Sequence, residues 1–288
     1  MIDWKHALIL FGAAALAGAV NSVAGGGTLL TFPALLWTGQ LANVANATST
    51  VALWPGQLSS LFGYRNEIGK NRDAIVRLAV PSLLGGTVGA ILFIRTPSTV
   101  FADLVPYLIL LATLLFVAQE PLSRWLRSRA DRASTDVPVD ATVERNRDEL
   151  SGTAWAGIIV FQFFVAIYGG YFGAGIGILM LAALGLMGFT NIHRMNGLKN
   201  INGLCINAVA AAIFISRGLV QWPITILMAV GSIFGGYAGA GVARKLGQKN
   251  VRRIIIFIGF ALTLSLLVKK PNLGPPPGRH RPTGTRRI

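Results

Sequence analysis

Residues 7–38 decide the fold, and they read ALILFGAAALAGAVNSVAGGGTLLTFPALLWT. The stretch contains no charged residue, but the run Gly25-Gly26-Gly27 interrupts it. A hydrocarbon core about 30 Å thick needs about 20 helical residues to cross it, and consecutive glycines disfavour a continuous helix. The stretch therefore predicts a broken helix or helical hairpin, with segments 7–23 and 28–38, that is either re-entrant or crosses twice.

A second interrupted apolar stretch, 154–188, predicts the same arrangement in the other half of the chain. Adding 150 to a residue number in the first half repeatedly gives the same residue in the second, without gaps. Three pairs of matching stretches illustrate this: Ala24-Gly25-x-Gly27-x-Leu29 with Ala174-Gly175-x-Gly177-x-Leu179, Asn46 with Asn196, and Gly85-Gly86-x-x-Gly89-Ala90 with Gly235-Gly236-x-x-Gly239-Ala240. A single offset held over such a span indicates an internal duplication.

Composition places both halves in a membrane. The 288 residues are 53% hydrophobic and 13% charged, with a mean hydropathy of +0.58, whereas a soluble domain carries about 25% charged residues. Ten apolar segments recur along the chain: 7–23, 28–38, 47–63, 78–94, 101–119, 154–172, 174–188, 196–215, 223–243 and 252–268. The predicted fold is an all-α polytopic integral membrane protein, with two repeats that each contain a Gly-broken helical hairpin and three transmembrane helices.

The same segments predict the domain organisation. Residues 1–119 form the first transmembrane repeat, 120–151 a cytoplasmic linker, and 152–268 the second repeat. The basic, proline-rich tail 269–288 cannot bury apolar surface and is predicted to be disordered.

The distribution of charge gives a prediction of topology. Residues 1–150 hold 12 Lys and Arg and all 11 acids, whereas residues 151–288 hold 14 Lys and Arg and no acid. The basic connections 64–77 and 244–253 correspond, through the 150-residue offset, to connections with one arginine each, so basic loops change sides between the halves. Cytoplasmic loops are the basic ones, and this favours repeats of inverted topology. A parallel duplication with four crossings per repeat is the alternative.

Several functional classes are disfavoured. The single Cys205 excludes a disulfide framework, and His6, His193 and His280 lie too far apart in sequence for a metal-ligand spacing. No metal or other cofactor and no enzymatic activity is therefore expected. The basic residues lie in membrane-flanking loops and a tail, so a nucleic-acid partner is not expected either.

The glycine clusters have two interpretations. Paired helix breaks in inverted halves indicate a binding site at the membrane midplane, where helix N-termini favour an anion; close helix packing is the alternative. We favour packing for Gly85, Gly89, Gly235 and Gly239. We favour the site for Gly25, Gly26, Gly27, Gly173, Gly175 and Gly177, with Asn21 and Tyr171 as flanking candidates.

A polar stripe on the segment 196–215 supports the same site. Asn196, Lys199, Asn200, Gly203 and Asn207 share one helical face, and the matching face of the first half carries Asn46, Ser49, Thr50, Leu53 and Gln57. An ionisable residue within a span is a functional candidate, so Lys199 is expected to bind an anion. The alternative is that Lys199 extends to the headgroups beside His193 and Arg194.

These motifs resemble the TauE/SafE family of sulfite exporters and toluene sulfonate uptake permeases, over roughly residues 7–268. The resemblance rests on the stretches 21–30, 47–49, 169–175 and 196–200, with Pro33, Pro55-Gly56 and Tyr64-Arg65. It implies a multi-pass transporter of the bacterial inner membrane for small sulfur-containing anions, sulfite or an organosulfonate. A passive channel or uniporter for another small oxyanion or carboxylate is the alternative, and a monomer and a homodimer are both open. The expected partners are the small anion and the lipid bilayer.

Overall fold

The computed structural model describes residues 3–23, 25–61, 72–135, 152–186, 192–246 and 248–268. These ranges form ten helices and no strand, which confirms an all-helical fold. The helices of the first half are α1 (Trp4–Val23), α2 (Thr28–Trp37), α3 (Ala42–Leu61), α5 (Arg72–Arg95) and α6 (Ser98–Thr135). Those of the second half are α7 (Gly152–Tyr171), α8 (Ile176–Leu186), α9 (Ile192–Ser216), α10 (Trp222–Leu246) and α11 (Gln248–Val268).

Each of the ten apolar segments predicted from the sequence corresponds to one helix. Within the described ranges, three helical stretches are long and apolar enough to cross a membrane: Asp73–Arg95, Ser98–Ala118 and Met195–Ser216. Helices α2 and α8 have 10 and 11 residues. At 1.5 Å per residue each extends for about 16 Å, roughly half of a hydrocarbon core. The helix breaks therefore fall within the apolar part of the molecule.

Helix α6 extends beyond its apolar part. Its apolar stretch Ser98–Ala118 matches the predicted segment 101–119, and the helix continues to Thr135 through the first half of the linker expected at 120–151. The stretch 120–135 is rich in charge. The remainder of that linker, 136–151, and the tail 269–288 lie outside the described residues.

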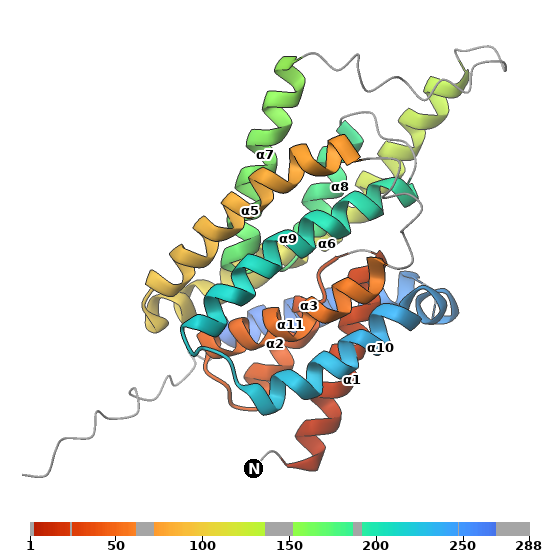
Figure 1. Cartoon of the computed structure of the whole chain (residues 1–288). Coiled ribbons are helices and arrows are strands. Elements are labelled where there is room, and N and C mark those ends of the chain that lie inside the picture. The colour runs from red at the N-terminus through yellow and green to blue at the C-terminus, as the bar shows by residue number, and fades with distance from the viewer. Residues whose placement is uncertain are drawn as a thin grey trace, which may run out of the picture.

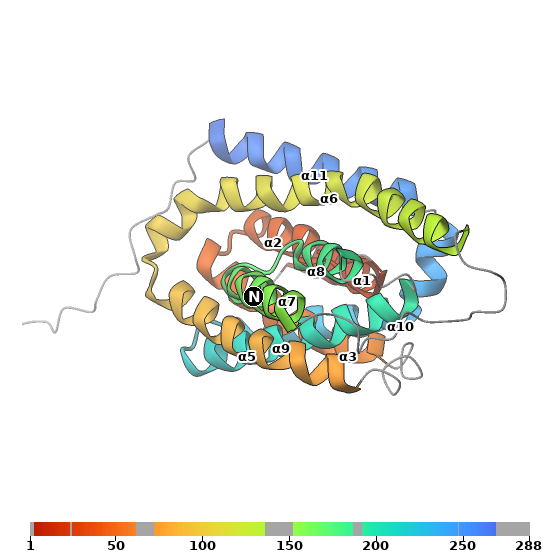
Figure 2. The ribbon, with the colours of Figure 1, turned by 90° about the horizontal axis from the view of Figure 1, so that it is seen from above.

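The helices form two walls with the broken helices between them. Figure 2 shows α6 and α11 side by side along one side of the molecule, and α3, α5, α9 and α10 along the opposite side. Helices α1, α2, α7 and α8 lie between these walls, with α2 in contact with α11 and α8 in contact with α6. The walls run lengthwise across the view of Figure 1, whereas α1 and α7 are steeper.

Glycines allow the closest helix approaches. A Cβ at Gly85 or Gly89 of α5 would meet the backbone of α7, and one at Gly235 of α10 would meet the carbonyl of Ala15 in α1. Small residues bring membrane helices into close contact in this way. The packing interpretation of these three glycines is confirmed, while the surroundings of Gly239 lie outside the described part.

Contacts between helices recur with their partners exchanged. Helix α1 packs on α10 as α7 packs on α5, and α3 packs on α10 as α9 packs on α5. The indole Nε1 of Trp54 in α3 donates to the carbonyl of Leu204 in α9 at 3.3 Å, across a sequence separation of 150. The two halves therefore contact each other through corresponding surfaces.

The gap-free offset of 150 does not hold at the glycine breaks. Helices α3, α5 and α6 begin 150 residues before α9, α10 and α11, but α1 and α2 begin 148 residues before α7 and α8. Two bonds confirm the difference: the N–H of Gly25 donates to Val20, and the N–H of Gly173 donates to Tyr168. The second half has two more residues between the starts of α8 and α9. The prediction that paired Gly25 with Gly175 was therefore two residues out of structural register.

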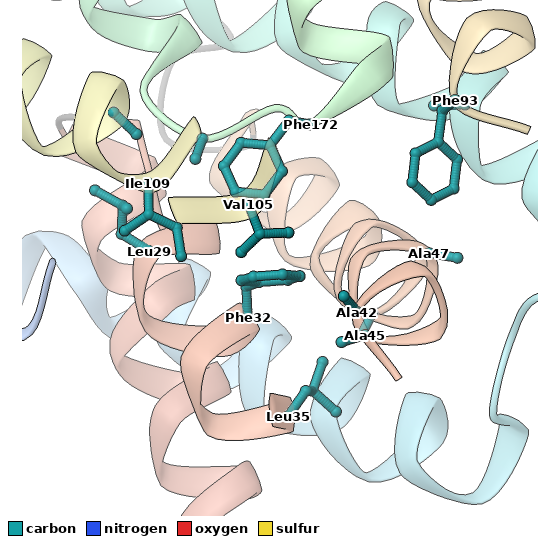
Figure 3. Packing of buried hydrophobic residues seen from close by; sticks show 14 of the residues in the cluster. Leu29, Phe32, Leu35, Ala42, Ala45, Ala47, Phe93, Val105, Ile109 and Phe172 are labelled. Atoms are coloured by element: carbon teal, nitrogen blue, oxygen red, sulfur yellow. The ribbon is translucent and has the colours of Figure 1, made fainter. Parts of the chain in front are cut away.

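The main core joins the broken helices to the walls. Figure 3 shows Phe32 of α2 facing Phe172, with Val105 of α6 beside them. The rings of Phe32 and Phe172 are 5.3 Å apart and meet edge to face. This packing fixes the chain on the N-terminal side of the second break.

Candidate functional site

The two glycine breaks meet at the centre of the molecule. Gly25 has a φ of +73°, and the Cβ of any other residue there would lie 2.9 Å from the Cα of Gly177. A left-handed conformation and direct backbone contact both require glycine at this position. Breaks that are distant in sequence are thus brought into contact.

A pocket with an empty volume of about 520 Å³, open solvent at its mouth included, lies at this junction. Its walls come from both breaks and from α3, α8 and α9. The lining residues are Asn21, Gly25, Gly26, Thr28, Thr50, Leu53, Gln57, Gly173, Ile176, Gly177, Met180, Lys199, Asn200, Gly203 and Asn207.

Lys199 is the charged residue of this lining, which otherwise consists of neutral polar, glycine and apolar residues among the described part of the chain. Lys199 is 3% exposed and lies within the apolar stretch Met195–Ser216. A buried cation in an apolar span is costly unless its surroundings compensate it. The pocket is therefore suited to a ligand that carries negative charge.

Two lining amides have atoms without a protein partner. The Nδ2 of Asn200 and the Oε1 of Gln57 are buried and form no hydrogen bond. A buried polar group without a partner is costly, and Asn200 is only 6% exposed. A ligand in the pocket is one means of satisfying these atoms.

Asn21 has a defined role at the first break. Its Oδ1 accepts hydrogen bonds from the N–H groups of Gly26 and Gly27, at 2.8 and 2.7 Å. These N–H groups immediately precede α2, so the side chain holds the turn that leads into the helix rather than the first N–H groups of the helix itself. Its Nδ2 is left as the donor end of the amide.

The structure brings ten of the sixteen predicted site residues to the pocket wall. They are Asn21, Gly25, Gly26, Thr50, Gln57, Gly173, Gly177, Lys199, Asn200 and Asn207. Both polar stripes contribute to this set, so the α3 and α9 faces do lie against one cavity. Their contact with a ligand remains a prediction.

The other six predicted residues do not line the pocket: Asn46, Ser49, Asn196, Tyr171, Gly27 and Gly175. Most of their polar groups have partners in the protein. The Tyr171 hydroxyl donates to Oγ1 of Thr96 at 3.3 Å, and Nδ2 of Asn46 donates to the Tyr171 carbonyl at 3.0 Å. Oγ of Ser49 shares a hydrogen bond with Oγ1 of Thr31 at 2.6 Å. Tyr171 is better described as an anchor of the second break than as a ligand.

Five lining residues were not among the predicted set. Leu53 and Gly203 lie on the predicted polar faces, so their spacing was an available signal. Thr28 directly follows the glycine cluster. Ile176 and Met180 of α8 had no signal, because an apolar residue in a membrane helix looks the same whether it faces lipid, protein or a cavity.

A second polar cluster lies away from the pocket lining. Nε2 of Gln162 in α7 donates to Oγ of Ser82 in α5 at 2.8 Å, and this hydroxyl lies 3.3 Å from Oδ1 of Asn202 in α9. Each of the three residues is at least 97% buried. The cluster joins three helices, and a glutamine in an otherwise apolar segment was its sequence signal.

An all-helical chain with apolar spans around a buried polar pocket is a membrane protein. A family model described as "Sulfite exporter TauE/SafE" matches residues 10–266, and the chain belongs to this family.

Curated relatives agree with this assignment. A protein of Haemophilus influenzae named "Probable membrane transporter protein" is 26% identical over 90% of this chain and 93% of its own length. "Probable membrane transporter protein YfcA" of Escherichia coli is 27% identical over 90% of this chain and 88% of its own. No solved structure matches the chain significantly. The fold, the pocket and these relatives place the chain among membrane transporters.

Proposed function

We propose that this chain is a secondary transporter that moves small sulfur-containing anions, sulfite or an organosulfonate, across the bacterial inner membrane. The observation that carries the proposal is the position of Lys199, buried in the wall of a pocket where both helix breaks meet. The description of the family model, a sulfite exporter, supports sulfur oxyanions as the substrate class.

The chemistry of the wall supports an anion rather than a cation. The described lining contains a lysine, the amides of Asn21, Asn200, Asn207 and Gln57, and no carboxylate. Amide and ammonium groups donate hydrogen bonds to oxyanions. Within an apolar surrounding such bonds are stronger than in water.

The exchange of helix contacts between the halves supports a twofold repeat and a multi-pass topology, and the basic connections that change sides between the halves support its inverted form. A twofold relation puts α3 against α9 and α6 against α11, and gives α1 and α7 corresponding partners. In transporters of this design, substrate binds between the repeats at discontinuous helices, and the repeats move against each other for alternating access. The pocket between the two breaks fits that description.

Binding to the purified protein tests the proposal. Sulfite, methanesulfonate and chloride are compared by thermal unfolding in detergent and by isothermal titration. The parent protein is expected to bind a sulfur oxyanion, and Lys199→Ala to weaken that binding by about 100-fold or more, since removing one partner of a buried charged pair typically costs 2–5 kcal/mol. Arg217→Ala is the matched control, because Arg217 is exposed at the end of the same helix.

Two results would contradict the proposal. A folded Lys199→Ala variant that binds the anion as the parent does would remove Lys199 from the site. Flux in proteoliposomes that only follows the anion gradient, and is indifferent to any imposed ion gradient, would favour a passive channel over a secondary transporter.

A further inference from the structure

The two breaks begin alike and then differ, in backbone and at one side chain: positive φ angles fall at Gly25 and Gly26 in the first break and at Gly173 and Gly175 in the second. With the 148-residue register of the broken helices, Asn21 corresponds to Gly169. The bonds Gly25 N–H to Val20 and Gly173 N–H to Tyr168, at 3.1 and 3.2 Å, fix this correspondence. The second break therefore has no side chain where the first has its cap.

At the first break, a protein oxygen already occupies the turn that leads into α2. Oδ1 of Asn21 accepts from two consecutive N–H groups, those of Gly26 and Gly27. An anion at this place would have to displace that amide oxygen. These two donors are therefore used within the chain.

At the second break, the donors that correspond to Gly26 and Gly27 are the N–H groups of Ala174 and Gly175. Among the described residues, no acceptor is found for the N–H groups of Gly175, Ile176 and Gly177. The last two belong to the pocket lining. The hydroxyl of Tyr168 reaches this break but donates to the carbonyl of Ala174 at 2.8 Å, so it occupies none of them.

An independent observation points to a ligand at the same place. Asn200 is 94% buried and lines the pocket with Ile176 and Gly177, and its Nδ2 has no hydrogen-bond partner. Its counterpart in the first half is Thr50, whose hydroxyl donates to the carbonyl of Asn46 at 3.0 Å. Of these two counterparts, the residue with an unused donor is therefore the one in the second half.

We propose that the bound anion is held by the second break alone, with an oxygen on the N-terminus of α8 and on Nδ2 of Asn200, while Asn21 is a positioning residue that fills the equivalent place at α2. This inference rests on the proposed function, and it makes the binding site asymmetric between the two halves. A helix N-terminus of this kind favours an anionic oxygen through its free N–H groups and its dipole. The pocket then holds one anion per chain rather than one at each break.

The test is to install the missing cap. Gly169→Asn places an amide at the position equivalent to Asn21, and Gly169→Ala is its control, since both add a Cβ near the side-chain tips of Ile206 and Ile176, at 2.9 and 3.3 Å. Titration with methanesulfonate is expected to show at least a tenfold weaker affinity for Gly169→Asn than for Gly169→Ala. Asn21→Ala is expected to lower the thermal stability of the ligand-free protein and to weaken the affinity by a smaller factor than Gly169→Asn does, because it removes no donor from the second break.

A second pair of variants keeps the test valid if position 169 does not tolerate a side chain. Asn200→Ala is expected to weaken binding at least tenfold and by a larger factor than Thr50→Ala. Binding that is lost in a folded Asn21→Ala and retained in Asn200→Ala would assign the anion to the first break and overturn the inference. A parent protein that binds none of the anions would instead overturn the proposed function itself.

Discussion

The two glycine breaks occupy matching places in the two halves and differ in how they are stabilised. The first break is held by close contacts: Gly25 contacts Gly177, a Cβ at Gly26 would overlap the ring of Phe116, and Asn21 holds the turn before α2. The second break is held at its edges, by the Tyr168 bond to Ala174 and by the ring of Phe172. Its N–H groups at Ile176 and Gly177 are left toward the pocket.

This difference shows that a duplicated backbone does not require duplicated chemistry. Irregular backbone within a membrane is tolerated only where protein or a polar cavity surrounds it. Both breaks line the pocket, and at the first a side chain of the protein also binds two N–H groups. At the second, a ligand would supply the acceptor that Asn21 supplies in the other half.

The largest expected effect comes from the contact between the breaks. Gly25→Ala forces a side chain into a left-handed backbone and against the Cα of Gly177, and should destabilise the protein by about 4 kcal/mol. Gly12→Ala, in the preceding helix α1, is the control, because a Cβ there meets nothing within 4 Å. This variant should remain within about 1 kcal/mol of the parent. Equal thermal unfolding midpoints for both variants would show that the breaks do not touch.

The anchor of the second break should have a smaller effect. Phe172 is 2% exposed and packs against Phe32 and Phe101, so Phe172→Ala is expected to destabilise the fold by about 3 kcal/mol. It should also weaken anion binding, because the break that carries the open N–H groups would lose its support. Phe164→Ala is the control for stability and binding, because Phe164 lies on the exposed side of α7, the helix that ends just before Phe172. Weaker stability with unchanged anion affinity in Phe172→Ala would separate the anchor from the site.

Most of the fold could be predicted because apolar segments contrast with charged connections. That contrast located the apolar span of α6, Ser98–Ala118, but carried no signal for the charged helical extension to Thr135. It also could not locate the two additional residues between Ile176 and Ile192. Sequence identity at one offset paired Gly25 with Gly175, whereas the helix ends pair it with Gly173.

The site was predictable only through its polar residues. The stripe on α9 placed Lys199 and Asn200 on one face, and both reach the pocket. The role of Asn21 could not be read from the sequence, because an amide can donate or accept and only the geometry shows its oxygen on two N–H groups. Tyr171 was selected for its phenol next to a break, but that hydroxyl is directed to Thr96.

The smallest expected effect concerns the bond that supports the second break from its carbonyl side. Tyr168→Phe keeps the ring and removes the donor to Ala174, a fully buried residue. The loss should cost about 1 kcal/mol, which corresponds to a decrease of about 2–4 °C in the unfolding midpoint. Tyr107→Phe, on an exposed part of α6, is the matched control and should leave the midpoint unchanged. Because the Tyr168 hydroxyl occupies a carbonyl and none of the open N–H groups, anion affinity should change by less than about threefold. A larger loss of affinity would mean that the conformation of Ala174, and not only the free donors at Ile176 and Gly177, determines whether the second break can hold an anion.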